Sequence, residues 1–414
     1  MSLDGDNLVL NINILEGRQN RLKVEKIKFN NHEIFNDLEI DFKNKDGQIL
    51  DTIVLIGENG SGKTTLLKCI YDSFDIDERG YEEDWKNIVR LTPALYTTTV
   101  KLEDNEVGML HPDIVFETGD KPDEPKVVYM PTEINFEKVN KVDNTFDVKT
   151  YFQNIIDQNM TENIPSMIAA KMNKEIFRNR NKTIGEVIDN VCDDINGIFK
   201  VMDLDVKLVG LSEDNNTRPI FKNSLGKEFD ITGLSSGEKQ LFLRALSLKF
   251  LDVNNSVILI DEPEISLHPQ WQRKIIDVYK SIEENNQLII ATHSPHIVGG
   301  VKSENLRVMT KDTDGIKIIN NDNLSETYGK NIGDILCTTM ELDSLRNEDI
   351  TDKLNKVHDL LSKNLYNTDE FKDVFNYLRK YLGDADKDIM RIRLEISIRE
   401  KRNAANEEKG SMEC

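Results

Sequence analysis

Three glycines, a lysine and two threonines stand together in this chain at the spacing that phosphate binding requires. Residues 57–65 read GENGSGKTT, directly after the apolar run 52–56 and directly before the apolar run 66–70. A strand that enters a glycine-rich turn points backbone N–H groups at a phosphate, and the next helix adds its positive dipole end. Lys63 would reach the β- and γ-phosphates of a nucleotide and Thr64 would bind Mg²⁺. The predicted nucleotide-binding residues of this loop are Gly57, Asn59, Gly60, Ser61, Gly62, Lys63, Thr64 and Thr65.

Three later segments carry groups that a nucleotide site needs. An apolar run from residue 257 ends in Asp261 and Glu262. Residues 233–240 read GLSSGEKQ and precede a helical run, and a second apolar run leads to His293. Each segment also has a simpler reading, because buried strands often end in acidic turns, serines commonly cap helices, and a histidine at a strand end is more often structural.

The order of the four segments favours the functional reading. P-loop, signature, acidic strand end and strand-end histidine follow one another as they do in the ATP-binding-cassette (ABC) ATPases, which this chain resembles over about residues 20–310. The run 261–269, DEPEISLHP, also looks like the SMC/RecF/OLD branch of that superfamily. The signature residues, which are nucleotide-binding in the family, are Ser235, Ser236, Gly237 and Glu238.

The resemblance implies an ATPase that converts ATP and water to ADP and phosphate with Mg²⁺. Thr64 and Asp261 would hold the metal. Glu262 would act as the base or water-orienting group, and His293 would contact the γ-phosphate; both are expected to be catalytic. In the family the signature serine and glycine complete the site of the opposite protomer. The expected assembly is therefore a homodimer or higher oligomer whose heads pair around ATP.

One element departs from the family pattern. The family's Q-loop glutamine follows a strand after the P-loop helix, and the matching strand here is expected at 126–131. Thr132 and Glu133 come next, where a glutamine would stand. Gln153 and Gln158 lie further on in a helix-like stretch, so the contact of the Q-loop glutamine has no assigned residue.

The element pattern predicts an α/β fold of the ABC-ATPase head type: a mixed sheet with a P-loop helix, a β-rich subdomain, a small helical lobe and a C-terminal helical extension. We expect an ATPase domain over residues 1–330, with a helical insertion at about 149–202, and a partner or oligomerisation region over 331–414. Further strands are expected near 95–103 and 112–117. Residues 66–233 are too few for an SMC coiled coil and show no sustained heptads.

The charge composition of the chain indicates how it can interact with nucleic acid. The chain has 53 basic and 74 acidic residues, a formal charge of −21, so it is not expected to coat nucleic acid non-specifically. Two basic stretches are read either as solvated helix faces or as nucleic-acid contacts. They comprise Lys171, Lys174, Arg178, Arg180 and Lys182, and near the end Arg391, Arg393, Arg399, Lys401 and Arg402.

The same composition predicts a cytoplasmic protein without a membrane partner. No apolar run approaches the ~18 residues that span a bilayer, and the first residues, MSLDGD, do not resemble a signal peptide. The four cysteines show no C-x-x-C spacing, so we expect neither a zinc site nor a disulfide framework.

The end of the chain carries a second resemblance. Residues 328–336 and the helical pair around 382–391 look like the C-terminus of small ATPases in Septu-type and retron-associated antiphage systems, which work with a separate HNH nuclease subunit. The resemblance implies a sensor or regulatory ATPase subunit that reaches nucleic acid through its complex. The region lacks the strand-end carboxylates of a TOPRIM nuclease. Its helical face with Leu354, Val357 and Leu361 is expected either to bind a partner or to pack against the ATPase core of the same chain.

Two other function classes stay open at this point. The first is a RecF-like repair or replication ATPase that binds DNA directly, and it predicts a basic groove that the acidic composition does not indicate. The second is a transporter ATPase, which the long insertion before the signature disfavours.

Overall fold

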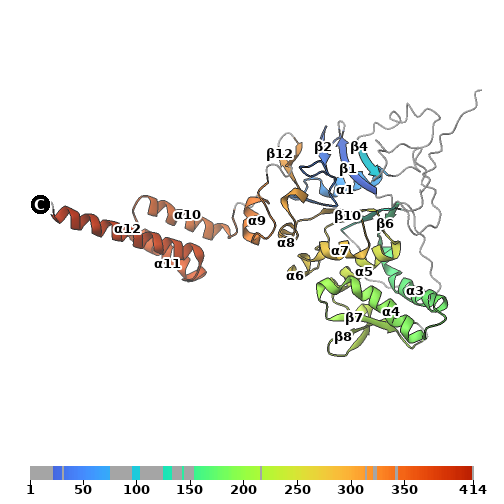
Figure 1. Ribbon diagram of the computed structural model, residues 1–414. Coiled ribbons are helices and arrows are strands. Elements are labelled where there is room, and N and C mark those ends of the chain that lie inside the picture. The colour runs from blue at the N-terminus through green and yellow to red at the C-terminus, as the bar shows by residue number, and fades with distance from the viewer. Residues whose placement is uncertain are drawn as a thin grey trace, which may run out of the picture. The chain divides into compact units, whose positions relative to one another are not determined.

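The computed structural model describes residues 22–29, 32–74, 96–102, 125–132, 142–143, 153–214, 217–312, 315–319, 324–340 and 344–412. The chain divides into two units, Met1–Met340 and Glu341–Cys414. The first unit is a mixed α/β domain and the second is helical (Figure 1). The fold class expected from the sequence is confirmed.

A seven-stranded sheet forms the centre of the first unit. Its order is β13 (Gly315–Ile319), β12 (Leu306–Asp312), β3 (Thr52–Gly57), β11 (Gln287–Ala291), β10 (Val257–Asp261), β5 (Val127–Met130) and β6 (Gln153–Ile155). The strands are parallel except β13, which pairs antiparallel with β12. Alternate residues of β3 serve two cores: Ile53 and Leu55 face one, and Val54 and Ile56 the other. Burial of both faces explains why this strand reads as a continuous apolar run.

One face of the sheet is covered by the P-loop helix and a small antiparallel sheet. Helix α1 (Lys63–Asp72) buries Leu66, Leu67 and Ile70 in the core that β1 also lines. The small sheet has the order β2 (Glu39–Asp41), β1 (Leu22–Phe29) and β4 (Tyr96–Leu102). This small sheet, drawn in blue and cyan in Figure 1, contains β4, the strand expected near 95–103, whereas the strand expected at 126–131 is β5 of the central sheet.

The other face of the central sheet packs against α5 (Ser236–Leu251) and α7 (Ile275–Ile282). Apolar residues of both helices lie in the same core as Val54 and Ile56 of β3. The helical lobe comprises α2 (Gln158–Glu162), α3 (Ile164–Arg178) and α4 (Ile184–Ile198). An antiparallel sheet joins the lobe, with β7 (Val206–Leu211), β8 (Pro219–Asn223) and β9 (Glu228–Asp230). The short helices α6 (Pro269–Gln272), α8 (Pro295–Val298) and α9 (Ile332–Thr338) also belong to this unit.

The expected helix from about residue 149 is wrong at its start. Residues Gln153–Ile155 form β6, the edge strand that pairs in parallel with β5. The N–H of Ile156 also donates to the carbonyl of Tyr129 at 2.9 Å. Main-chain hydrogen bonds to the sheet therefore override the local helical pattern. The strand expected near 112–117 lies outside the described residues.

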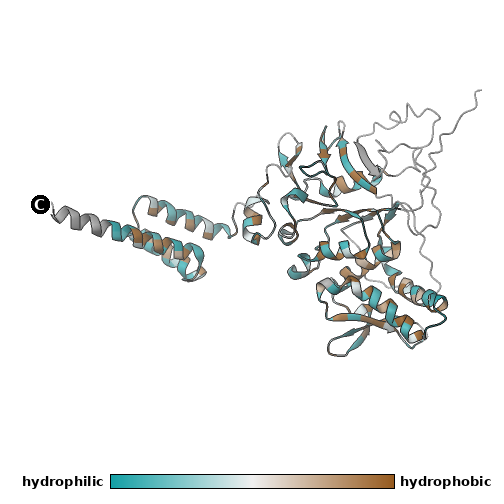
Figure 2. Ribbon diagram, in the orientation of Figure 1, coloured by the Kyte–Doolittle hydropathy of each residue, from teal (hydrophilic) through white to brown (hydrophobic). Residues whose placement is uncertain are grey.

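Over its described residues, 344–412, the second unit has three helices: α10 (Glu348–Ser362), α11 (Asp369–Leu382) and α12 (Lys387–Met412). Leu354, Val357 and Leu361 are buried in its core with Phe371, Leu378, Ile389 and Ile392. This face of α10 is therefore buried within its own unit, so both expectations for it, a partner interface and packing against the ATPase core, are wrong. Brown apolar stripes along these helices alternate with teal polar ones in Figure 2. Within the part of the chain that is described, no helix has both the length and the apolar character to cross a membrane.

Val357 tests the role of this core. It is fully buried, so Val357→Asp would place an unpaired charge among apolar side chains and should cost about 3 kcal/mol or more of stability. Hydrogen exchange across residues 344–412 of the full chain should show lost protection. Asn355→Asp, which adds the same charge at a neighbouring exposed position, should leave protection intact. Unchanged protection in the Val357 variant would contradict the core assignment.

Candidate functional site

The phosphate loop lies between β3 and α1, and two of its glycines are required by the local geometry. Gly57 has φ +155°, and a Cβ there would stand 2.1 Å from the carbonyl oxygen of Met309 on β12. Gly62 has φ +88°, and its Cβ would stand 2.9 Å from the ring of Phe35. Side chains at either position would force the backbone apart, so the glycines let the loop pack against its neighbours.

Lys63 is held inside the loop by backbone oxygens. Its Nζ donates to the carbonyl oxygens of Gly57 at 2.8 Å and Glu58 at 3.0 Å, and to the Oγ of Ser61 at 3.3 Å. Burial lowers the pKa of Lys63, and the charges of Glu262, Asp261 and Glu264 partly oppose that shift. No carboxylate among the described residues forms a salt bridge with this ammonium group. Its charge is therefore available to an anionic ligand at the mouth of the loop.

Thr64 joins the loop to the acidic end of β10. Its Oγ1 donates to Oδ2 of Asp261 at 2.9 Å, across 197 residues of sequence. Asp261 is 1 % exposed, and its Oδ1 has no hydrogen-bond partner in the described part of the chain. The described residues contain no cluster of three or more His, Cys, Asp or Glu side chains fit for a metal. Mg²⁺ in nucleotide sites needs only one or two protein oxygens besides phosphate and water, so this hydroxyl and carboxylate fit it.

Glu262 and His293 face each other next to this pair. Oε1 of Glu262 lies 3.6 Å from Nε2 of His293, and both side chains are partly exposed. Glu262 has φ 45°, a strained backbone conformation for a glutamate, directly after the end of β10. Burial and then the nearby charge of Lys63 lower the pKa of His293, and the charges of Glu262 and Asp261 partly oppose that shift. The structure thus brings together a carboxylate and an imidazole beside the phosphate loop.

Glu264 is a residue of this site that the sequence reasoning missed. Its Oε1 accepts hydrogen bonds from Oγ1 of Thr292 at 2.6 Å and from the N–H of His293 at 2.8 Å. Its Oε2 is buried and has no partner among the described residues, and burial raises its pKa. The only sequence signal was the third carboxylate of the DEPE run, 261–264. Glu264 fixes the backbone that carries His293.

The signature segment is shaped as a helix N-terminus open to solvent. Ser235 caps α5 through a capping box with Glu238, with Oγ of Ser235 and Oε2 of Glu238 2.7 Å apart. A Cβ at Gly237 would stand 2.7 Å from the carbonyl oxygen of Ser266. Ser235 and Ser236 are exposed. Within the described chain, no hydrogen bond or ion pair joins residues 235–238 to residues 57–65.

The residue that replaces the Q-loop glutamine is not found among the two candidates. Nε2 of Gln153 donates to the carbonyl of Tyr71 at 2.7 Å, and that of Gln158 to Glu162 at 2.6 Å on the surface. Glu133 lies outside the described residues. The end of β5 is held instead by Arg244 of α5, which is 2 % exposed and donates through Nη2 to the carbonyl oxygens of Pro131 at 3.0 Å and Thr132 at 2.8 Å. In the sequence, Arg244 stands out only as a single arginine within the otherwise apolar run 241–246.

Residues 135–299 match a family model described as "AAA domain, putative AbiEii toxin, Type IV TA system". The matched range begins after the phosphate loop and includes the signature, the acidic end of β10 and His293.

The chain is also similar to curated proteins that are named after retrons and after Septu systems. The chain is 28% identical over 175 residues to "Retron Vc95 probable ATPase" of Vibrio cholerae serotype O1 biovar El Tor, covering 39% of this chain and 33% of that protein. It is 24% identical over 322 residues to "Septu protein PtuA" of Bacillus mycoides (strain KBAB4), covering 70% and 40%. A 58-residue segment is 45% identical to "Septu protein PtuA" of Bacillus thuringiensis, covering 14% and 15%. The chain thus spans well under half the length of these relatives.

Solved structures with a similar chain path include the "SMC head domain from Thermotoga maritima", with 15% identity and a TM-score of 0.39 over 72% of this chain and 98% of that one. A second is the SMC head bound to the C-winged helix domain of ScpA, with 13% identity and a TM-score of 0.38 over 72% and 96%. The sequence matches confirm the recognition of a P-loop ATPase domain, similar to a probable retron ATPase and to Septu proteins.

The raised pKa of Glu264 predicts how the stability of the folded protein depends on pH. Because its folded pKa is raised, the folded protein binds this proton more tightly than the unfolded chain, and stability falls as pH rises through the folded pKa. Glu264→Gln keeps an oxygen for Thr292 and His293 but removes the buried charge. The melting temperature of the variant relative to wild type should therefore increase as the pH rises from 4.5, the ordinary pKa of a glutamic acid, through the raised pKa of the folded state. A difference that stays constant or shrinks would contradict this, and Glu284→Gln, at an exposed position, serves as the control.

Proposed function

We propose that this protein binds and hydrolyses ATP as an ABC-type ATPase. The observation that carries the proposal is the hydrogen bond between Thr64 and Asp261, which places a metal-binding oxygen pair directly beside the Glu262–His293 pair. These groups come from α1, β10 and the end of β11, and they converge next to the lysine of the phosphate loop.

Each group has a role in phosphoryl transfer to water, which needs positioning and neutralisation of phosphate charge. The loop N–H groups and Lys63 bind the phosphates. Thr64 and Asp261 hold Mg²⁺, which when bound neutralises charge on the β- and γ-phosphates. Glu262 orients the attacking water and accepts its proton, and His293 donates a hydrogen bond to the γ-phosphate.

We infer that the active form is a head-to-head pair with ATP between its members. The exposed N-terminus of α5 presents Ser235, Ser236 and free backbone N–H groups, which is an anion-binding arrangement. It makes no polar contact with the phosphate loop of its own chain in the described residues. The signature therefore serves the nucleotide held by a second copy.

The biological role we propose is that of the sensor or regulatory subunit of a bacterial antiphage defence complex with a separate HNH-type nuclease, working in the cytoplasm. The support is the similarity to proteins named as a probable retron ATPase and as Septu proteins. Residues 1–330 are the ATPase domain in this proposal. Residues 331–414 bind the nuclease or a further copy, and nucleic acid is reached through the complex.

The partner surface proposed on this region lies on α12. Met390, Leu394 and Ile398 follow one another at four-residue steps and are 52 %, 63 % and 44 % exposed. They form a stripe separate from Ile389 and Ile392, which are buried in the core of the unit. A second apolar stripe on a helix whose first stripe is already packed is typical of an interface.

Glu262→Gln tests the chemistry. The variant keeps the phosphate loop and metal oxygens, so ATP affinity should stay within about threefold, while hydrolysis should fall by about 10²-fold or more because the proton acceptor is lost. Nucleotide binding and phosphate release are measured on the same preparation. Glu58→Gln, an exposed position in the loop, is the matched control. Near-normal turnover in the Glu262 variant would remove this residue from the catalytic role.

Mixing of inactive variants tests the shared site. Lys63→Ala and Ser235→Arg protomers should each be inactive alone, but a mixed pair contains one intact loop facing one intact signature. Random exchange should restore about a quarter of wild-type activity if sites act independently. If subunits exchange and no activity returns, each site is contained within one chain.

Leu394 tests the partner surface. Leu394→Asp places a charge on the exposed stripe, so the protein should keep its melting temperature but lose the nuclease when both are co-expressed and purified through this chain. The exposed-site variant Asn355→Asp should retain the nuclease. Full retention by the Leu394 variant would show that the stripe is not the interface.

A further inference from the structure

The tip of the helical lobe concentrates positive charge in a strongly acidic protein. It comprises the end of α3, the loop 179–183 and the start of α4, and it carries Lys174, Arg178, Arg180 and Lys182. All four are exposed. The carboxylates of this tip are those of Glu175 and Glu186, and Glu186 is engaged with Thr183 in the capping box of α4.

Some basic residues of this region form salt bridges within the protein and others form none with a described residue. Lys171, on the same helix, is bound to Asp194 at 3.1 Å, and Asp194 also binds Lys249 at 3.1 Å. Arg178 is 3.2 Å from Glu175 at the surface, a pair that solvent weakens. Lys174, Arg180 and Lys182 form no salt bridge with any described residue. Three cations of this basic stretch are therefore available to an external anion.

An exposed aromatic ring lies within this cationic group. Phe177 is 72 % exposed, which is unusual for a phenylalanine. Lys174, three residues before it, lies on the same face of α3 as the ring, and Arg178, the next residue along the helix, is also exposed. A ring flanked by cations is the arrangement that stacks an unpaired base while ammonium and guanidinium groups bind the adjoining phosphates.

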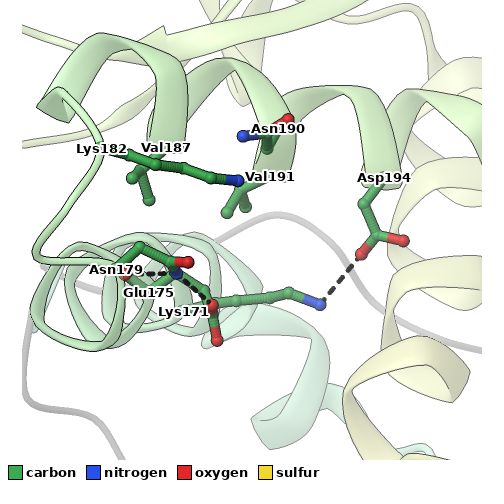
Figure 3. A pocket seen from close by; sticks show the side chains of 8 residues that line it. All are labelled: Lys171, Glu175, Asn179, Lys182, Val187, Asn190, Val191 and Asp194. Carbon is green, nitrogen blue, oxygen red and sulfur yellow. Dashed lines mark hydrogen bonds and ion pairs between the residues drawn. The ribbon is translucent and has the colours of Figure 1, made fainter.

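A polar pocket of about 310 Å³ opens beside this face, between α3 and α4. Figure 3 shows Lys182 reaching over the pocket from the loop, with the Lys171–Asp194 ion pair on the other side. Asn190 also lines it and makes no hydrogen bond with a described residue. Amide groups of this kind bind base edges.

We propose that the tip of the helical lobe binds single-stranded nucleic acid, with a base stacked on Phe177 and phosphates bound by Lys174, Arg178, Arg180 and Lys182. Glu186, Asp189 and Asp193 lie three and four residues apart on another face of α4, where they repel a phosphate backbone. Contact is thereby confined to a short site of a few nucleotides. A duplex has no unpaired base for the ring.

The site is tested without ATP, so its failure is distinct from a failure of the proposed ATPase. Labelled oligothymidylate, oligouridylate and a duplex of about 20 units are titrated against the full protein over a series of salt concentrations. Phe177→Ala should weaken binding to a single strand at least about fivefold and leave the salt dependence unchanged, since stacking is lost and the phosphate contacts remain. Leu225→Ala, the loss of another exposed apolar side chain, should have no effect.

The cations are tested by a triple charge reversal, Lys174→Glu, Arg180→Glu and Lys182→Glu. Loss of three phosphate contacts should reduce the slope of log K against log salt by about 2. Lys227→Glu, Lys280→Glu and Lys311→Glu make the same change in net charge elsewhere and should leave the slope intact. A preference for thymidylate or uridylate identifies the strand as DNA or RNA. Tighter duplex binding, equal effects of both triple variants, or a Phe177 variant that loses a protein partner but no oligonucleotide would overturn the proposal.

Discussion

Parallel pairing of β3, β11 and β10 is the constraint on which the rest of the site depends. Because adjacent parallel strands end at one edge of a sheet, the phosphate loop, Asp261 and His293 meet there although they are far apart in sequence. The same pairing requires strands buried on both faces, which the P-loop helix and the small sheet provide on one side and α5 and α7 on the other. The Thr64–Asp261 hydrogen bond then sets the distance between loop and carboxylate.

Much of this edge could be predicted from sequence because its residues follow apolar runs of strand length. The glycine at 57 was predictable as part of a loop, but its physical reason, the carbonyl of Met309, comes from a strand some 250 residues later. Capping by one of the two signature serines, Ser235 or Ser236, was the simpler reading of that segment, and Ser235 does cap α5. The burial of Leu354, Val357 and Leu361 could not be decided, since an amphipathic face looks the same whether its own unit or a partner covers it.

The residues that sequence reasoning missed act through backbone atoms. Glu264 accepts from the N–H of His293, and Arg244 donates to the carbonyls that end β5. Neither contact leaves a spacing rule in the sequence, because any residue offers a backbone group. β6 was misread for a related reason: three residues at a sheet edge are held by main-chain hydrogen bonds to β5 and not by their own propensity.

The proposed ATPase function depends most on the sharing of ATP between two chains. The direct measurement is the rate of ATP hydrolysis per chain as protein concentration is varied at saturating ATP and Mg²⁺. A shared site predicts that specific activity rises with concentration and levels off as pairs form, in step with dimer content measured by sedimentation. A specific activity that stays constant down to concentrations at which the protein is monomeric would contradict it.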